Sequence, residues 1–162
     1  MKRHTISILV ENRFGALSRI SGLFSARGYN IESLSVAPTA DPTVSRMTIV
    51  TMGDDKVIEQ IGKQLNKQID VIKVWNASEH DYIGRELILV RVALGDKSQD
   101  EIVRAGQAFG AKVVDVSPAS IALEMMGDEQ EVENFLNLLK PFGIKELIRS
   151  GTVVMLKEGA RG

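Results

Sequence analysis

The sequence contains no cysteine, which excludes disulfide bonds, zinc–thiolate sites and thiol nucleophiles. It contains two histidines, His4 and His80, and neither has a second histidine three or four positions away. That spacing gives no support for a metal site, so we interpret both as ordinary surface or edge residues. Metal and thiol catalysis are therefore not expected from this chain.

The sequence also lacks a long apolar run and an excess of charge of either sign. No run approaches the roughly 18 to 20 apolar residues that cross a bilayer, and MKRHTISILVEN turns polar too early for a signal peptide. Twenty basic and 21 acidic residues nearly cancel, so no overall field attracts nucleic acid or an anionic membrane. We expect a cytoplasmic protein that recognises its partner by shape or at a local site.

Hydrophobic periodicity in the first half predicts six elements. Apolar residues alternate in HTISILV as in a strand, and then recur at three and four positions in a helix that ends at Gly28, a residue suited to a left-handed cap. Two strands joined by PTADPT follow, then a helix that begins at Asp54 and Asp55, and then the strand IDVIKVW. This order is the split βαβ, or ferredoxin-like, arrangement.

The same order repeats after residues 76–85, which lose all periodicity and are typical of a linker. Capping-box patterns at Ser98–Glu101 and Asp128–Glu131 predict the two helices of the second half. We predict an α+β fold of two tandem ferredoxin-like βαββαβ units. Its divisions are an N-terminal domain 1–77, a linker 78–85, a C-terminal domain 86–157 and a polar tail 158–162. Such sheets leave a helix-free face and an edge strand for dimerisation.

The turn NRFGALS, residues 12–18, is a candidate binding site. The backbone N–H groups of Gly15, Ala16, Leu17 and Ser18 would be the unsatisfied donors of a helix N-terminus, which attract a carboxylate. Gly15 lets a ligand approach the backbone, and the Asn12 amide can accept from an ammonium and donate to a carboxylate. A free α-amino acid suits this set. The alternative is purely structural, with Asn12 shaping the turn and Ser18 a solvated helix residue.

Asn30 and Ile31 form a second candidate segment, at the entry to the strand after the first helix. Gly28 needs no ligand, because a helix that ends in glycine is already explained. If two copies pair their sheets, Asn30 and Ile31 of one chain could face the turn of the other. A ligand there would bridge the dimer.

The motifs of catalysis and RNA recognition are missing from the sequence. It has no G-x-S-x-G elbow, no phosphate-binding loop and no G-x-G-x-x-G turn. A stand-alone enzyme would need a convergent acid, base or nucleophile, which the scattered carboxylates do not supply. An RNA-recognition motif shares the element order but needs strand aromatics within a K/R-G-F/Y-G/A-F-V-x-F/Y pattern, which is absent.

The stretches LVENRFGALSRISGLFSARGYNIESLSVAPTADPTVSRMTIV and VIEQIGKQLNKQIDVIKV closely resemble the small, regulatory subunit of acetolactate synthase. The similarity runs through SGTVVML and is weaker after the linker. The resemblance implies an N-terminal ACT domain, a noncatalytic role and dimerisation through the ACT domains. It also implies a large catalytic subunit that carries thiamine diphosphate, magnesium and FAD, and feedback inhibition by valine in branched-chain amino acid biosynthesis.

In this family the amino acid lies at the ACT dimer interface. The resemblance therefore implies a valine site made of Asn12, Gly15, Ala16, Leu17 and Ser18 of one chain with Asn30 and Ile31 of its neighbour. A preference for leucine or isoleucine stays open. The alternative interpretation is an ACT-type sensor for another amino acid and another enzyme.

Overall fold

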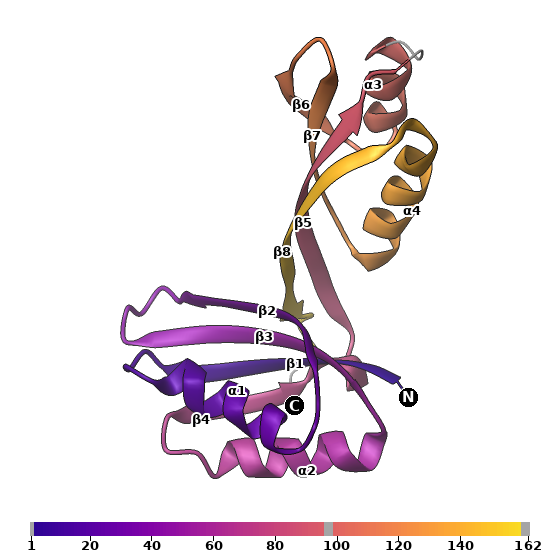
Figure 1. Ribbon diagram of the computed structural model, residues 1–162. Coiled ribbons are helices and arrows are strands. Elements are labelled where there is room, and N and C mark those ends of the chain that lie inside the picture. Colours follow the sequence, from indigo (N-terminus) through magenta and orange to yellow (C-terminus); the bar gives the residue numbers. More distant parts are fainter. Residues whose placement is uncertain (1, 96–98, 160–162) are drawn as a thin grey trace. The chain divides into compact units, whose positions relative to one another are not determined.

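The structure, a computed structural model, describes residues 2–95 and 99–159. Its described residues divide into two compact units (Figure 1). The first unit comprises Met1–Ile83 with Thr152–Gly162, and the second comprises Gly84–Gly151. Two tandem βαββαβ units were expected, and that fold class is confirmed.

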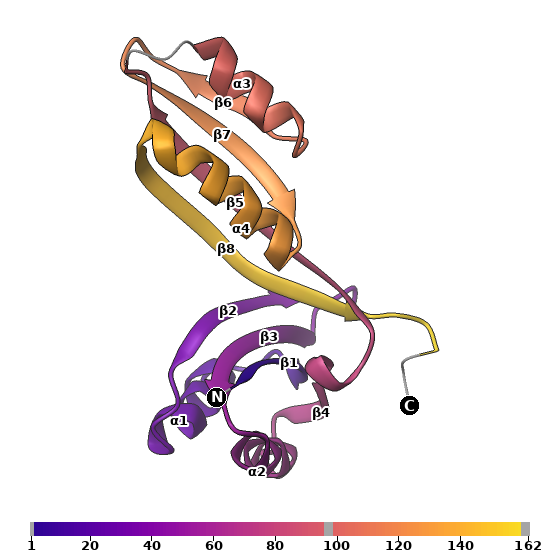
Figure 2. The same ribbon diagram turned by 90° about the vertical axis from the view of Figure 1, so that its right-hand side faces the viewer.

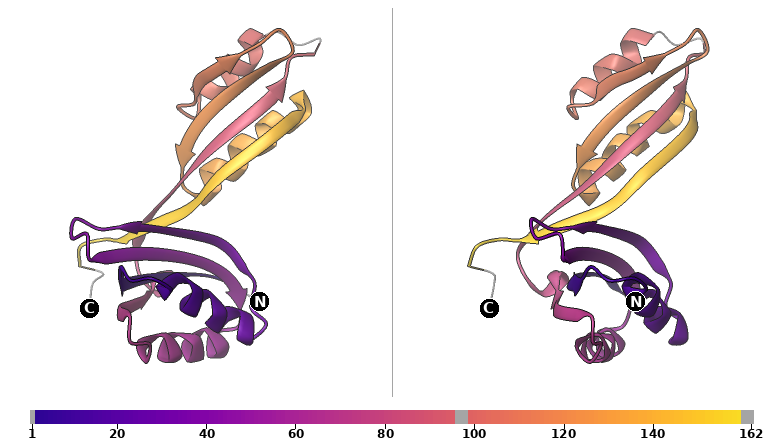
Figure 3. Two further views of the ribbon diagram at one scale, coloured as in Figure 1. Left: turned by 60° about the vertical axis from the view of Figure 1, so that its left-hand side comes forward. Right: turned by 90° about the vertical axis from the view of Figure 1, so that its left-hand side faces the viewer.

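The first unit contains a four-stranded antiparallel sheet with two helices on one face (Figures 1 and 3). The strand order is β2-β3-β1-β4, so β1 and β3 are central and β2 and β4 are edges. The elements are β1 (Lys2–Glu11), α1 (Ala16–Ala26), β2 (Ile31–Pro38), β3 (Val44–Gly53), α2 (Asp55–Asn66) and β4 (Val71–Asn76). A short 3-10 turn, η1 (Ala77–Glu79), follows β4.

The core of this unit follows the periodicity of its strands and helices. Alternate residues of β1 point to the helices, where Ile6 and Ile8 are almost fully buried. Phe24 of α1 and Ile61 of α2 meet them in the same cluster. Asp54 caps α2 by accepting from Val57 N at 3.0 Å, which confirms the predicted helix start.

Gly28 ends α1 as predicted. Its φ is 71°, and its N–H donates to Ser25 O at 3.0 Å while Tyr29 N–H donates to Phe24 O at 3.0 Å. These two bonds are the Schellman pattern, which needs a residue in the left-handed region after the helix. The chain therefore leaves α1 in a defined direction and enters β2 at Ile31.

The second unit repeats the arrangement, with α3 and α4 on one face of its sheet (Figure 2). Its strand order is β6-β7-β5-β8, and its core includes Ile88, Leu123 and Phe135. The elements are β5 (Tyr82–Ala93), α3 (Gln99–Gln107), β6 (Lys112–Val116), β7 (Ser120–Gly127), α4 (Glu129–Leu139), η2 (Lys140–Phe142) and β8 (Ile144–Leu156).

Helix capping in the second unit is confirmed at α4. Asp128 accepts from Glu131 N at 2.8 Å, and Asp128 N donates to the Glu131 side chain at 3.2 Å, which together form the predicted capping box. The other predicted capping box, at Ser98–Glu101, begins at a residue that lies outside the described residues.

The predicted domain limits differ from the two units in two places. Residues 78–85, interpreted as a linker, contain the end of η1 and the first residues of β5. Residues 152–157, placed in the C-terminal domain by the repeated order of elements, pack with the first unit instead. Element order cannot show this, because it does not say where the last part of a strand finds its apolar partners.

The interpretation of His4 as a surface or edge residue is wrong. His4 is 4% exposed, and its Nε2 lies 3.2 Å from Gly53 O. The physical reason is the strand order: β1 is central, so its inward-facing side chains are covered by helices. His80, in contrast, is exposed.

The helix-free face of the first sheet is also less open than expected. Ser7 and Thr48 pair across β1 and β3 on this face, and both are 2% exposed. A small cluster contains Ala77, Val154 and Leu156, and Trp75 and Tyr82 pack against it. Thr152 N donates to Ser33 Oγ at 3.0 Å, which holds the same stretch against β2. The chain's own C-terminal residues thus occupy part of the surface that we assigned to dimerisation.

Candidate ligand-binding turn

The turn between β1 and α1 brings five of the predicted residues together. Gly15 is the N-cap of α1 with φ 84°, a left-handed conformation that favours glycine, and no side chain caps the helix. Ala16 is buried, whereas Leu17 is 40% exposed and Ser18 is exposed. The turn therefore presents a bare helix N-terminus at the surface of a single chain.

The backbone donors of this turn are nearly as expected. Among the residues that the structure describes, the N–H groups of Gly15, Leu17 and Ser18 have no hydrogen-bond acceptor. The N–H of Ala16 is different, because it donates to Arg13 O at 3.3 Å. The expectation of four unsatisfied donors is corrected to three. Three unpaired amides and the dipole of α1 are features that favour a carboxylate, so the turn stays a candidate site.

Asn12 is anchored to the turn that joins β2 and β3. Its backbone N–H donates to Thr43 O at 2.7 Å, and its Nδ2 donates to Pro42 O at 3.0 Å. The amide nitrogen that was expected to bind a carboxylate is therefore already engaged. The Asn12 Oδ1 accepts no hydrogen bond within the described ranges, and it keeps the capacity to accept from an ammonium.

The turn that anchors Asn12 is itself ordered by Asp41. The Thr43 side-chain hydroxyl donates to Asp41 Oδ1 at 2.7 Å and the Thr43 backbone N–H donates at 2.9 Å. These two hydrogen bonds, the hydroxyl first, lower the pKa of Asp41 because they favour its ionised form. Asp41 thus helps to place the two carbonyl groups that hold Asn12.

Arg19 and Asp70 form an ion pair beside the turn. The sequence analysis did not predict a role for either residue. Asp70 is 4% exposed, and it accepts from Nε of Arg19 at 2.8 Å and from Nη2 of the same guanidinium. Arg19 Nη2 also lies 3.4 Å from Phe14 O. A Cβ on Gly15 would lie 2.9 Å from Arg19 Nη1. The guanidinium therefore occupies the space beneath the turn and connects it to the start of β4.

Asn30 and Ile31 lie at the other end of α1 from the turn. The helix has 11 residues, which corresponds to about 16 Å. Asn30 is exposed and its carbonyl accepts from Thr51 Oγ1 at 2.7 Å, while Ile31 is half-buried and packs against the core. A single chain does not bring all seven predicted residues together, so a ligand that contacts them all needs two chains.

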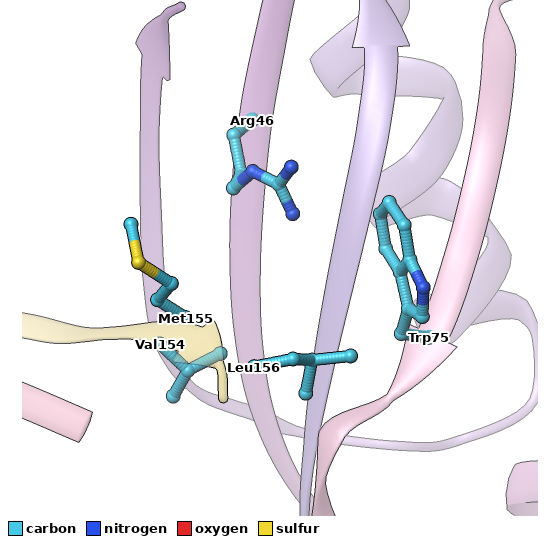
Figure 4. Close-up of a pocket in the computed structure, with 5 residues that line it drawn as sticks. All are labelled: Arg46, Trp75, Val154, Met155 and Leu156. Atoms are coloured by element: carbon cyan, nitrogen blue, oxygen red, sulfur yellow. The ribbon is translucent and has the colours of Figure 1, made fainter. Parts of the chain in front are cut away.

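A separate pocket of about 190 Å³ lies on the helix-free side of the first sheet (Figure 4). Arg46 and Trp75 form one part of its lining, and the guanidinium carbon lies 5.0 Å from the indole ring centroid. Arg46 also donates to Ser7 Oγ at 2.9 Å. Val154, Met155 and Leu156 complete the lining. The pocket includes none of the seven predicted residues, so it is distinct from the turn.

Within residues 2–95 and 99–159, no group of three or more histidine, aspartate or glutamate side chains is arranged to hold a metal ion. None of the helices described there is long and apolar enough to cross a membrane.

The fold and the turn define a class of protein, a tandem ferredoxin-like chain whose first unit is an ACT domain. The profile of the AHAS small subunit-like ACT domain matches residues 6–73. The profile of the small subunit of acetolactate synthase matches residues 85–158. The chain therefore belongs to the acetolactate synthase small-subunit family, as the sequence motifs indicated.

Individual relatives agree with this assignment over nearly the whole chain. A probable acetolactate synthase small subunit of Archaeoglobus fulgidus is 50% identical over 155 residues, which cover 96% of this chain and 97% of the relative. The acetolactate synthase small subunit of Haemophilus influenzae is 48% identical over 152 residues, 93% of each chain. The crystal structure of the Thermotoga maritima small subunit superimposes with a TM-score of 0.85 at 36% identity, covering 97% of this chain and 98% of that one.

Proposed function

We propose that this chain is the noncatalytic regulatory subunit of acetolactate synthase, which activates the catalytic subunit and makes it sensitive to valine. The observation that carries the ligand site is the bare N-terminus of α1, where the amides of Gly15, Leu17 and Ser18 are unpaired. Membership of the small-subunit family supports a regulatory role. Thiamine diphosphate, magnesium and FAD would then belong to the catalytic partner.

In the proposed complex, the carboxylate of valine lies on the amides of Gly15, Leu17 and Ser18. The ammonium lies near the Oδ1 of Asn12, because that oxygen can still accept. The isopropyl group packs between Leu17 of one chain and Ile31 of the other. Its burial contributes about 1.5–3 kcal/mol. One methylene changes binding by only about 1–3 kcal/mol in such a pocket, so leucine and isoleucine are also candidate ligands.

The second chain would pair through β2, which is an edge strand with β3 as its neighbour. In an antiparallel pair of β2 strands, the start of one strand lies beside the end of the other. The end of β2 leads into the turn that binds Asn12 through Pro42 O and Thr43 O. Such a pair would bring Asn30 and Ile31 of one chain to the ligand-binding turn of its partner.

A ligand that bridges two chains can regulate by changing their relative orientation. For this, valine must bind the activating and the inactive arrangements with different affinities. A difference of about 1–3 kcal/mol is typical of allosteric coupling and would suffice. The pair of the half-exposed Arg19 with the buried Asp70 connects the turn to the start of β4, so a displacement of the turn could reach β4.

Calorimetric titration of the full chain with valine tests the proposal. We compare Gly15→Asp with Gly15→Asn, because both residues tolerate the left-handed region and differ mainly in charge. The aspartate carboxylate lies within reach of the Arg19 guanidinium and occupies the place of the ligand carboxylate, so valine binding is lost. Gly15→Asn weakens binding less. A wild-type chain that binds none of valine, leucine and isoleucine, or a Gly15→Asp variant that binds valine normally, refutes this site.

A further inference from the structure

Phe14 and Ile69 present large apolar side chains almost completely to solvent. Their relative exposures are 103% and 88%. Single exposed apolar residues are common on protein surfaces, so exposure alone does not identify a binding surface. The positions of these two residues and the contacts of the turns that carry them indicate whether they form a binding surface.

Both residues lie in turns at the same end of the first sheet, and hydrogen bonds join those turns. Arg19 connects Phe14 O to the carboxylate of Asp70, which follows Ile69 in the chain. Glu11 N–H, at the end of β1, donates to Asp70 O at 2.8 Å. We call Phe14 and Ile69 the apolar apex. Because the two turns that carry these residues are already ordered, binding of a partner costs little conformational entropy in this chain.

The charge around the apolar apex is predominantly positive. The side chains of Arg13 and Arg19 are 62% and 50% exposed, and Lys67 is also exposed. The carboxylates with which the two arginines pair are less exposed, at 36% for Glu11 and 6% for Asp70. A complementary partner surface has an apolar pocket with an acidic rim.

The position of the apex selects between two occupants. A second copy that pairs through β2 lies along one edge of the sheet, whereas Ile69 precedes β4 at the opposite edge. Such a copy leaves Ile69 uncovered. We propose that the apolar apex docks into an apolar pocket with an acidic rim on the catalytic subunit of acetolactate synthase. This inference rests on the proposed function and names the surface through which it acts.

Docking at the apex explains how ligand and partner influence each other. Phe14 belongs to the same turn as Gly15. Arg19 contacts both residues, because its backbone N–H donates to Gly15 O at 3.1 Å and its Nη2 lies 3.4 Å from Phe14 O. A ligand on the amides of the turn and a partner on Phe14 therefore act on one short segment of backbone. Each changes the affinity of the turn for the other by the same factor, as linkage requires.

The test measures activation of the purified large subunit as the full chain is titrated into it. Truncating an aromatic anchor of an interface raises the half-saturating concentration by about 30-fold, and we expect this for Phe14→Ala. We expect about tenfold for Ile69→Ala, because it buries less area. The matched control is Met126→Ala on β7 of the second unit, which is 64% exposed and should change the value by less than about twofold.

The charge of the rim gives a second measurement. Lys67→Glu should slow association of the two subunits at low salt, and the difference from wild type should shrink as salt screens the charges. An unchanged association rate would contradict an acidic rim on the partner.

Two results overturn the docking surface while the proposed function stands. In the first, wild type activates the large subunit and both apex variants activate it at wild-type concentrations. In the second, light scattering shows that the apex variants alter the oligomeric state of the chain alone, which makes the apex a contact between copies. If wild type does not activate the large subunit at any concentration, the proposed function fails and this inference fails with it.

Discussion

The ion pair of Arg19 and Asp70 should stabilise the first unit as well as the turn between β1 and α1. Replacing Arg19 by Met keeps a long side chain of similar helix propensity but removes the hydrogen bonds to Asp70. The Asp70 side chain is 6% exposed, so its carboxylate would stay largely buried without a partner. The variant therefore carries an uncompensated charge, and it should unfold more readily.

The structure limits the size of this effect. Removing one partner of a fully buried ion pair costs about 3–5 kcal/mol. The Arg19 side chain is 50% exposed, so water can reach the site when the guanidinium is absent. We therefore expect a loss nearer to that of a hydrogen bond to a charged group, about 1.5–3 kcal/mol in the free energy of unfolding.

Urea denaturation followed by tryptophan fluorescence measures this loss of stability in the first unit. The sequence has one tryptophan, and Trp75 lies in the first unit, so its emission reports on that unit. The control is Lys63→Met, which breaks the exposed pair with Glu59 and should cost about 0.5 kcal/mol or less.

The double variant Arg19→Met/Asp70→Asn tests the reason for the loss. It should recover part of the stability, because no charge is left buried. If the free energy of unfolding of Arg19→Met lies within about 0.5 kcal/mol of the wild-type value, the ion pair does not stabilise the first unit.

Two further predictions concern helix ends. Gly28→Ala should lower the stability of the first unit by about 1–2 kcal/mol. The cost is conformational, because φ is 71° at this position and nothing lies within 4 Å of the added Cβ. Equilibrium unfolding followed by Trp75 fluorescence checks this, and an unchanged unfolding midpoint would contradict it. Asp128→Ala should cost about 1 kcal/mol in the second unit by removing the capping box of α4, and hydrogen exchange of the α4 amides should quicken while amides of α2 stay unchanged.

The sequence alone determined the element order, most of the core faces and two helix starts. Side-chain direction repeats every two residues in a strand and every 3.6 in a helix. The spacing of apolar residues therefore predicts the buried faces of β1 and α1, which include Ile6, Ile8 and Phe24. Caps are equally local: Asp54 and Asp128 act on amides three residues away. Motif resemblance predicted the family, which the comparisons confirm.

Tertiary structure decided what depends on contacts between distant segments. Arg19 and Asp70 are separated by 51 positions, and they meet because β4 lies beside β1 in the sheet. The burial of His4 follows from the central place of β1, which periodicity does not reveal. The same is true of the C-terminal residues that pack beside Trp75. Local sequence sets which way each side chain points, but strand order sets what it meets.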